Sequence, residues 1–222
     1  MLSKNWSTVF SLTLAIACTG FFSGKLPYAG KGMSPYVLAA HHWEGRVFLE
    51  HRKTSEYHSR IRETRVRDQI FQVVSKYRTG LDSHYLQKIS HWIVEESQKY
   101  RYDPLLLTAL IITESSFYNW ARSHRGALGL MQIQPETGME LAAETRLEWR
   151  GKPTLYDPAK NIALGAYYLN KLIQRFGDLA LALEAYNYGP TRLVRYLKRG
   201  YRPQGYSRRV LNRYELIRPQ PI

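Results

Sequence analysis

One stretch of the sequence constrains the fold more than any other, the run of apolar residues from Leu105 to Ile112. It follows Asp103, a residue typical of helix caps, and Pro104, which is favoured in a first helical turn. Thr108 is its one polar member. A helix that is apolar on nearly every face has no side to present to water. We therefore predict that this segment forms a helix at the centre of a domain.

Further helical patterns lie on both sides of this segment. Apolar residues at helical spacing predict one helix from Val66 to Tyr77, ended by Gly80, and another that begins after Asp82 or Ser83. Caps and spacing downstream predict helices over residues 135–143, 158–176, 179–186, 191–198 and 206–217. No strand longer than a few residues is indicated. The predicted fold class is therefore mainly α, with minimal β-structure.

The first residues of the sequence predict export. Lys4 precedes an apolar stretch that begins at Val9 and ends in the motif Ala-Ile-Ala, directly before Cys18. A short positive region, a short apolar core and an Ala-x-Ala ending are typical of a secretory signal peptide, here residues 1–17. The apolar stretch is shorter than the ~20 residues that a membrane-spanning helix needs. The alternative is an uncleaved membrane anchor.

Cys18 leaves two outcomes open. It is either the first residue after ordinary cleavage or the acylated residue of a lipoprotein, although the bacterial lipobox usually has a large aliphatic residue in place of Ala15. The first outcome predicts a periplasmic protein, and the second predicts attachment to outer-membrane lipid. Cys18 is the only cysteine, so no disulfide framework is expected. Residues 18–60 lack a sustained period and are predicted to be a linker, whereas residues 61–222 are predicted to form a single folded domain.

The charge of the chain favours an anionic partner. Its 32 Lys and Arg residues exceed its 18 Asp and Glu residues, which leaves a net charge of +14. Nine of the basic residues lie between Thr191 and Ile222, where Glu215 is the one acid. Candidate partners are nucleic acid, a membrane surface and a polymer that carries carboxylates. We expect no nucleic acid partner, because export would remove the protein from it and no recognition module is visible. A merely solvated basic face is the alternative.

Glu114 falls in the last turn of the predicted central helix. Ile111, Leu110 and Leu107 precede it by three, four and seven positions, so its carboxyl group shares a face with apolar side chains. Burial and the negative end of the helix dipole both disfavour the ionised form, so both raise its pKa. A carboxylic acid that stays protonated near neutral pH can protonate the leaving oxygen of a glycosidic bond. The alternative is a glutamate that merely reaches solvent at a helix end.

Five blocks of sequence accompany this glutamate in close order. They are Glu114-Ser115-Ser116-Phe117, Ser123-x-x-Gly126-Ala127-x-Gly129-Leu130-Met131-Gln132, Pro135-x-Thr137, Asn161-Ile162-x-x-Gly165-x-x-Tyr168-Leu169 and Ala185-Tyr186-Asn187-Tyr188-Gly189-Pro190. Together they resemble the lytic murein transglycosylases related to the catalytic domain of soluble lytic transglycosylase. The resemblance covers roughly Ile89 to Tyr214 and implies a lysozyme-like fold.

The resemblance also implies a specific reaction on peptidoglycan glycan strands. Such enzymes cleave the β-1,4 bond between N-acetylmuramic acid and N-acetylglucosamine, and the muramyl 6-hydroxyl attacks in place of water to leave a 1,6-anhydro end. Glu114 would act first as the acid and then as the base. The other matching positions, implied to bind substrate or hold the site, are Ser115, Ser123, Gly129, Met131, Gln132, Tyr186, Asn187 and Tyr206. No cofactor and no metal is expected, and partners in the cell-envelope machinery stay open.

The sequence offers one acid where most glycosidases use two. No Asp or Glu lies between Glu114 and Glu136, and both Glu136 and Glu140 fall early in a predicted helix, where acids stabilise the N-terminus. A substrate whose own 2-acetamido group stabilises the cation removes the need for a second carboxylate. Two alternatives stay open, a lysozyme that uses water and a wall-binding scaffold without turnover. Gln134 and Tyr188 depart from the family pattern, so the resemblance does not define subsite preference.

Overall fold

The computed structural model describes residues 60–218, all of which fall within one compact unit of the chain, Thr54–Ile222. The predicted signal peptide over residues 1–17, the two outcomes left open at Cys18, and residues 18–59 of the predicted linker over 18–60 lie outside the described residues, and these stay predictions. Between residues 60 and 218, no helix is both long enough and apolar enough to cross a membrane.

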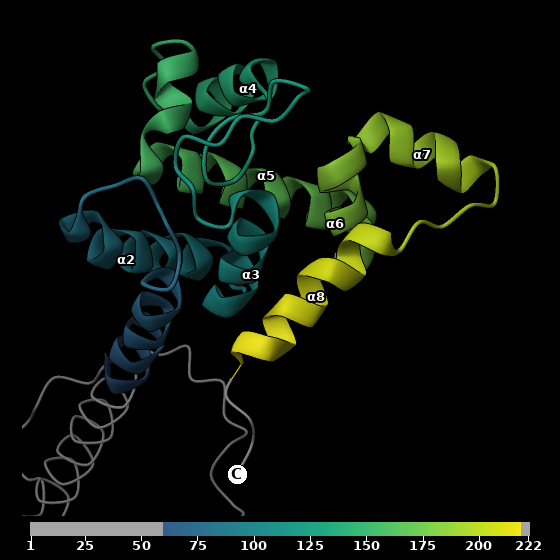
Figure 1. Cartoon of the computed structure of the whole chain (residues 1–222). Helices are drawn as coiled ribbons and strands as arrows, with labels where there is room; N and C mark the ends of the chain where they lie inside the picture. The colour runs from purple at the N-terminus through teal and green to yellow at the C-terminus, as the bar shows by residue number, and fades with distance from the viewer. Residues whose placement is uncertain (1–59, 219–222) are drawn as a thin grey trace, which may run out of the picture. The chain divides into compact units, whose positions relative to one another are not determined.

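The described part of the chain is built from helices (Figure 1). Residues 60–74 are helical and are followed by α2 (Ser83–Tyr100), α3 (Pro104–Ser115), α4 (Pro135–Thr145), the 3-10 helix η1 (Lys152–Tyr156), α5 (Pro158–Phe176), α6 (Leu179–Tyr188), α7 (Pro190–Lys198) and α8 (Gly205–Ile217). The extended pairing within residues 60–218 consists of two isolated antiparallel bridges, Arg122 with Leu128 and Leu128 with Ile133. The prediction of a mainly α fold with minimal β-structure is confirmed.

Side-chain caps fix where several helices begin, as the sequence predicted. The Asp103 carboxylate accepts a hydrogen bond from the Leu105 amide at 2.9 Å, and Asp157 accepts one from the Lys160 amide at 3.1 Å. Each satisfies an amide that has no partner inside its helix. The predicted helix through Tyr77 is wrong at its end, because the helix stops at residue 74. Tyr77 lies in the following turn and packs on the Phe117 ring at 5.5 Å.

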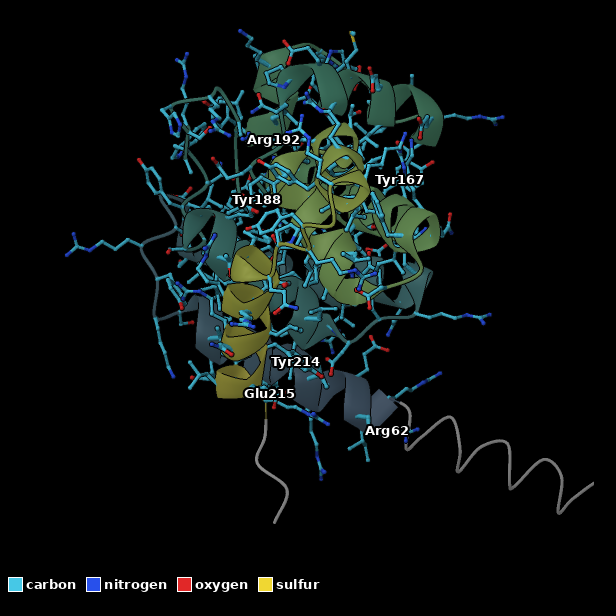
Figure 2. The ribbon with its side chains drawn as sticks, turned by 90° about the vertical axis from the view of Figure 1, so that its right-hand side faces the viewer. Arg62, Tyr167, Tyr188, Arg192, Tyr214 and Glu215 are labelled. Carbon is cyan, nitrogen blue, oxygen red and sulfur yellow. The ribbon has the colours of Figure 1, made fainter. Side chains whose placement is uncertain are left out.

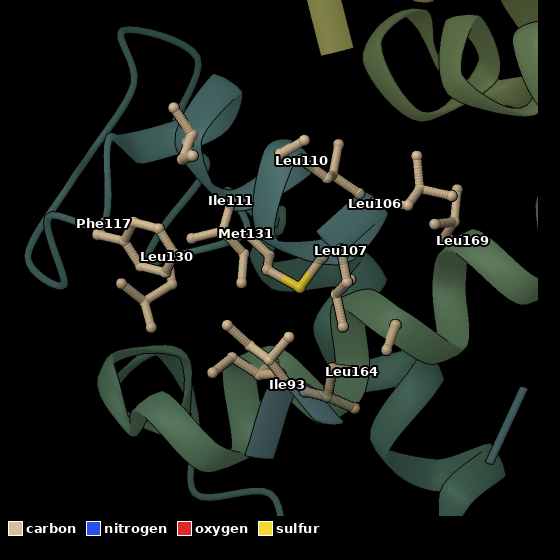
Figure 3. Close-up of a cluster of buried hydrophobic side chains, with 14 of the residues drawn as sticks. Ile93, Leu106, Leu107, Leu110, Ile111, Phe117, Leu130, Met131, Leu164 and Leu169 are labelled. Atoms are coloured by element: carbon tan, nitrogen blue, oxygen red, sulfur yellow. The ribbon is translucent and has the colours of Figure 1, made fainter. Parts of the chain in front are cut away.

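The apolar segment at Leu105–Ile112 is buried throughout, as predicted for a central helix. It forms most of α3, which packs against α2 and α8, while α5 packs against α2 and α6 (Figure 1). Figure 3 shows side chains of α2, α3 and α5 converging on Leu130 and Met131, which come from the loop after α3. The loop between α3 and α4 is therefore anchored in the core by these two buried side chains.

Gly165 lets this loop enter the core. A Cβ atom at Gly165 would lie 2.3 Å from the Met131 sulfur and 2.8 Å from the Met131 Cβ, closer than real atoms approach. Met131 is fully buried, so its side chain has no room to withdraw. A glycine on this face of α5 is thus a packing requirement, and it positions the loop that follows Glu114 against the helices.

Candidate active site

Glu114 lies in the last turn of α3, half-buried, with its carboxyl group directed at α8. The Tyr206 hydroxyl at the start of α8 donates a hydrogen bond to Glu114 Oε1. Burial raises the pKa of Glu114 from 4.5 to about 7, against the opposing effects of the Tyr206 hydrogen bond and the Arg209 charge. The predicted upward direction of the pKa shift agrees with this, as does burial, one of the two predicted causes.

The backbone directly after Glu114 is held in a rarely populated conformation. Ser116 and Phe117 have φ values of 50° and 59°, in the left-handed region that L-residues seldom adopt. The Phe117 side chain is fully buried, and the Ser116 amide donates to the Ile112 carbonyl at 3.0 Å. Burial of the ring offsets the cost of this turn, and such strain is typical of functional sites. The turn ends α3 abruptly after the carboxylate.

Tyr206 is itself positioned through a glutamate on another helix. Glu184 of α6 is fully buried, and its Oε1 accepts hydrogen bonds from the Ser207 amide at 2.8 Å and the Ser207 hydroxyl at 2.9 Å. Gln204 precedes α8 without a side-chain cap, so Glu184 supplies from another helix the acceptor that the first turn of α8 lacks. This contact fixes the residue next to Tyr206 and thereby holds the phenol on Glu114.

Two polar side chains hold the loop between α3 and α4. The Ser115 hydroxyl donates to the Leu130 carbonyl at 2.7 Å. Asn161 of α5 is fully buried, accepts from the Met131 amide at 2.7 Å, and donates to the carbonyls of Leu128 and Leu155 at 3.1 and 2.8 Å. One amide side chain thus satisfies three backbone groups that have no access to water. Ser115, implied by resemblance to be near the substrate, is placed where it supports the loop.

At Gly129 the backbone of this loop passes close to Leu155 of η1 and to Asn161 of α5. The φ of Gly129 is 80°, and a Cβ atom there would lie 2.2 Å from the Leu155 carbonyl oxygen and 2.3 Å from the Asn161 side-chain nitrogen. Any side chain would therefore break the contacts of Asn161. The glycine is required by its conformation and by the close backbone approach together.

Gln132 and Ser123 stand at the cleft side of the same loop. The Gln132 amide nitrogen donates to the carbonyls of Gly129 and Ala121, at 2.9 and 3.2 Å. The Ser123 hydroxyl accepts from the Ala127 amide at 3.0 Å, which closes the turn between them. Both side chains are only half-buried, so they combine a contact inside the loop with a surface on the cleft.

A cavity of about 440 Å³ opens over Glu114. The described residues that line it are Glu114, Ser123, His124, Arg125, Ala127, Gln132, Ile133, Gln134, Thr137, Tyr168, Tyr186, Asn187, Tyr188, Gly189 and Pro190. Five expected site residues meet here: Glu114, Ser123, Gln132, Tyr186 and Asn187. Four others, Ser115, Gly129, Met131 and Tyr206, lie outside this lining, with Tyr206 in contact with Glu114.

Tyr186 joins the cleft to the loop. Its hydroxyl donates to the Met131 carbonyl at 2.9 Å, and the centre of its ring lies 5.2 Å from the centre of the Tyr168 ring. Burial raises the pKa of both phenols, and for Tyr186 and Tyr206 the neighbouring Glu114 raises it further. The tyrosines around Glu114 therefore stay neutral hydrogen-bond donors over the whole range in which Glu114 titrates.

The sequence did not single out every residue that shapes this site. His124 and Arg125 line the cleft from an irregular turn, where no periodicity marks them. Asn161 stood in a quoted motif without an assigned role, and Glu184 directly precedes another quoted motif. A charged residue in an otherwise apolar helical stretch, as at Glu184, was the available signal. Within residues 60–218, no group of His, Cys, Asp or Glu side chains is arranged to hold a metal ion.

Comparison with known proteins identifies related sequences. Residues 91–208 match a family model described as the transglycosylase SLT domain. A transglycosylase of Enterobacteria phage PRD1 is 39% identical over 93 residues, which cover 42% of this chain and 32% of that protein. Membrane-bound lytic murein transglycosylase C of Cronobacter sakazakii is 31% identical over 137 residues, which cover 59% of this chain and 36% of that protein. The chain thus spans about a third of the length of these curated relatives.

Solved structures share the fold. The 70 kDa soluble lytic transglycosylase SLT70 of Escherichia coli superimposes with a TM-score of 0.53 at 26% identity, covering 58% of this chain and 24% of that one. A complex of the 70 kDa soluble lytic transglycosylase with bulgecin A gives a TM-score of 0.52 at 25% identity, covering 56% of this chain and 23% of the other. The predicted lysozyme-like fold is confirmed by this likeness.

Proposed function

Because the chain belongs to the transglycosylase SLT domain family, we propose that it is a peptidoglycan lytic transglycosylase with Glu114 as its catalytic carboxylate. The observation that carries the proposal is the state of this residue. Burial raises the pKa of Glu114 to about 7, and its side chain lines the cleft. The neutral phenol of Tyr206 holds the carboxyl group in place. A carboxylic acid of this kind can donate its proton near neutral pH.

In the first step, the protonated Glu114 gives its proton to the oxygen that links C1 of N-acetylmuramic acid to C4 of N-acetylglucosamine. The bond between C1 and this oxygen breaks, and the N-acetylglucosamine end leaves with a hydroxyl group. Glu114 becomes a carboxylate, whose charge is stabilised by the Tyr206 hydrogen bond and by Arg209. The 2-acetamido group of the sugar stabilises the positive charge that develops at C1.

In the second step, the 6-hydroxyl of the same N-acetylmuramic acid attacks C1, and its proton passes to the Glu114 carboxylate. A 1,6-anhydro ring forms, the acid is regenerated, and no water is consumed. One carboxyl group therefore serves both steps. This agrees with the cleft, because Glu114 is the only acidic side chain among its described lining residues.

Basic side chains near the cleft fit the anionic parts of the same substrate. Arg125 lines the cleft, and the Arg192 guanidinium of α7 lies 5.6 Å from the centre of the Tyr188 ring, another lining residue (Figure 2). Stem peptides carry carboxylates, which such cations attract. We infer that peptidoglycan is the anionic partner of the basic C-terminal part of the chain.

Export belongs to the same proposal. The pattern of residues 1–17 supports it, and some relatives carry the words membrane-bound or soluble in their names. We propose action in the periplasm, with two outcomes open at Cys18: ordinary cleavage before it, or its acylation and attachment to the outer membrane.

Mass spectrometry of fragments released from purified sacculi tests the reaction. The proposed chemistry yields muropeptides that end in 1,6-anhydro-N-acetylmuramic acid, each lighter by one water than the product of a lysozyme. Reducing ends alone would instead establish hydrolysis, and binding without any soluble product would indicate a scaffold.

Tyr206→Phe is expected to move the pH dependence of fragment release upward. The Tyr206 hydrogen bond lowers the pKa of Glu114, so its loss lets burial raise that pKa further above about 7. Glu114 then stays protonated to a higher pH, even as the rate falls. Initial rates measured from about pH 5 to pH 9 give the midpoint. Tyr196→Phe, on α7 and bonded to Arg192 instead, is the control. A midpoint that stays fixed or moves down in Tyr206→Phe would contradict the assigned contact.

A further inference from the structure

A second cavity, of about 620 Å³, shares no lining residue with the cleft over Glu114. It lies between the turn before α2, the side of α2 and the start of α5. Four aromatic residues line it, Tyr85, Trp92, Trp120 and Tyr156. We name this cavity the aromatic cavity.

Trp120 presents a rigid aromatic surface at this cavity. Its side chain is 49% exposed, yet its ring nitrogen donates to the Gly80 carbonyl at 2.9 Å. The ring also lies on Gly80 so closely that a Cβ atom there would be 2.8 Å from Trp120 Cδ1, and it packs against the Tyr156 ring at 5.3 Å. An exposed tryptophan that is held by Gly80 and Tyr156 loses little conformational entropy when a ligand stacks on it.

The polar groups of the aromatic cavity do not suit an anion. Asp82 and Asp157 line it, and Lys88 is the one basic residue among its described lining residues, although the chain as a whole carries +14. The Lys88 ammonium lies over the Tyr85 ring, 5.4 Å from its centre. The Asp82 carboxylate makes no capping hydrogen bond to α2, so it is available to accept hydrogen bonds from a ligand. Nucleic acid, phosphate and anionic lipid are therefore disfavoured by charge.

Aromatic rings beside acceptor carboxylates suit an uncharged ligand that has an apolar face and hydroxyl groups at its edge. We propose that the aromatic cavity binds an N-acetylamino sugar of a peptidoglycan glycan strand, away from the bond that is cleaved. The ring of such a sugar stacks on Trp120, and its hydroxyl groups donate to Asp82. This inference rests on the proposed function for the choice of polymer. The role of the aromatic cavity is to keep the enzyme on the sacculus between cleavage events.

The test measures retention on sacculi in the Glu114→Gln background, so that cleavage does not remove the ligand. Trp120→Ala is compared with Tyr118→Ala, a matched control because Tyr118 is 46% exposed and also packs on Gly80, but does not line the cavity. We expect Trp120→Ala to lower the apparent affinity about tenfold, and Tyr118→Ala to leave it unchanged. Tyr85→Ala, which alters the cavity from α2, provides a second variant should Trp120→Ala fail to fold.

The ligand is identified by repeating the measurement on sacculi from which an amidase has removed the stem peptides. Sugar binding is supported if Trp120→Ala lowers the apparent affinity equally for intact sacculi and for strands without stem peptides. Two results would overturn sugar binding. One is retention on sacculi that is the same with and without Trp120 and Tyr85. The other is an effect of these variants that disappears once the stem peptides are removed. The two proposals fail differently: absence of anhydro products from the wild-type chain refutes the transglycosylase, whereas normal products with retention independent of these residues refute the sugar site.

Discussion

Glu114→Gln is expected to lower the release of peptidoglycan fragments by roughly 10²–10⁴-fold, the usual contribution of a general acid. Glutamine keeps the shape of the side chain and can accept the Tyr206 hydrogen bond, but its amide has no acidic proton that can transfer to the leaving oxygen. Release of soluble fragments from sacculi is the measurement. Glu140→Gln, on the exposed side of α4, is the control and should retain wild-type rates.

The same substitution is also expected to change how the stability of the protein depends on pH. The folded-state pKa of Glu114 lies at about 7, above its ordinary value of 4.5, so the folded protein holds this proton more tightly than the unfolded chain does. The stability that this residue contributes is present below pH 4.5 and is lost as pH rises through about 7. Glutamine does not titrate. The melting temperature of Glu114→Gln relative to wild type should therefore rise from about pH 5 to pH 8, and a relative fall would show that the carboxylate is stabilised when ionised.

Asn161→Leu is expected to cost about 3–5 kcal/mol of unfolding free energy, because it leaves two buried backbone groups without a partner and removes one bond from a third. The Met131 amide and the Leu155 carbonyl lose their partner, whereas the Leu128 carbonyl still accepts from the Ile133 amide at 3.0 Å. Chemical denaturation gives the free energy, and fragment release should fall with it because the loop beside Glu114 loses its anchor.

Asn170→Leu is the matched control for this variant. Asn170 lies on the same helix, half-buried, without a part in the loop contact, and its replacement should cost less than about 1 kcal/mol. If Asn161→Leu were as mild as this control, the loop would be held by its apolar side chains alone, and the role assigned to Asn161 would be wrong.

Local patterns in the sequence predicted much of the fold. The run at Leu105–Ile112 is buried on every side because no polar face interrupts it, and the caps at Asp103 and Asp157 act on amides only two or three residues away. The 3-10 helix η1 and the helix end at residue 74 were missed. Both lie where tertiary contacts, such as Tyr77 on Phe117, decide the local conformation.

The site was predictable to the extent that one helix determines it. The place of Glu114 at the end of α3, its apolar surroundings and the direction of its pKa follow from spacing along the chain. The contacts that complete the site join distant segments, as in the bond from Tyr206 to Glu114 and those from Ser207 to Glu184. Periodicity carries no information about such pairs, so resemblance had to suggest Tyr206, and the one signal for Glu184 was its charge within an apolar helical stretch.

Roles were harder to predict than positions. Resemblance grouped Ser115, Gly129 and Met131 with residues near the substrate, whereas here each is engaged with the protein itself. Ser115 bonds the Leu130 carbonyl, Gly129 makes room for Asn161, and Met131 fills the space over Gly165. We propose that these residues contribute to substrate binding by shaping the loop that carries Gln132.

The titration of the Glu114 carboxyl group tests the central claim most directly. Carbon NMR of protein labelled at the glutamate side-chain carboxyl, with the Glu114 signal assigned by its absence in Glu114→Gln, follows this one proton. We predict a midpoint at pH about 7, which leaves a large share of Glu114 protonated where it must act as an acid. A midpoint near 4.5, the ordinary value, would contradict the account.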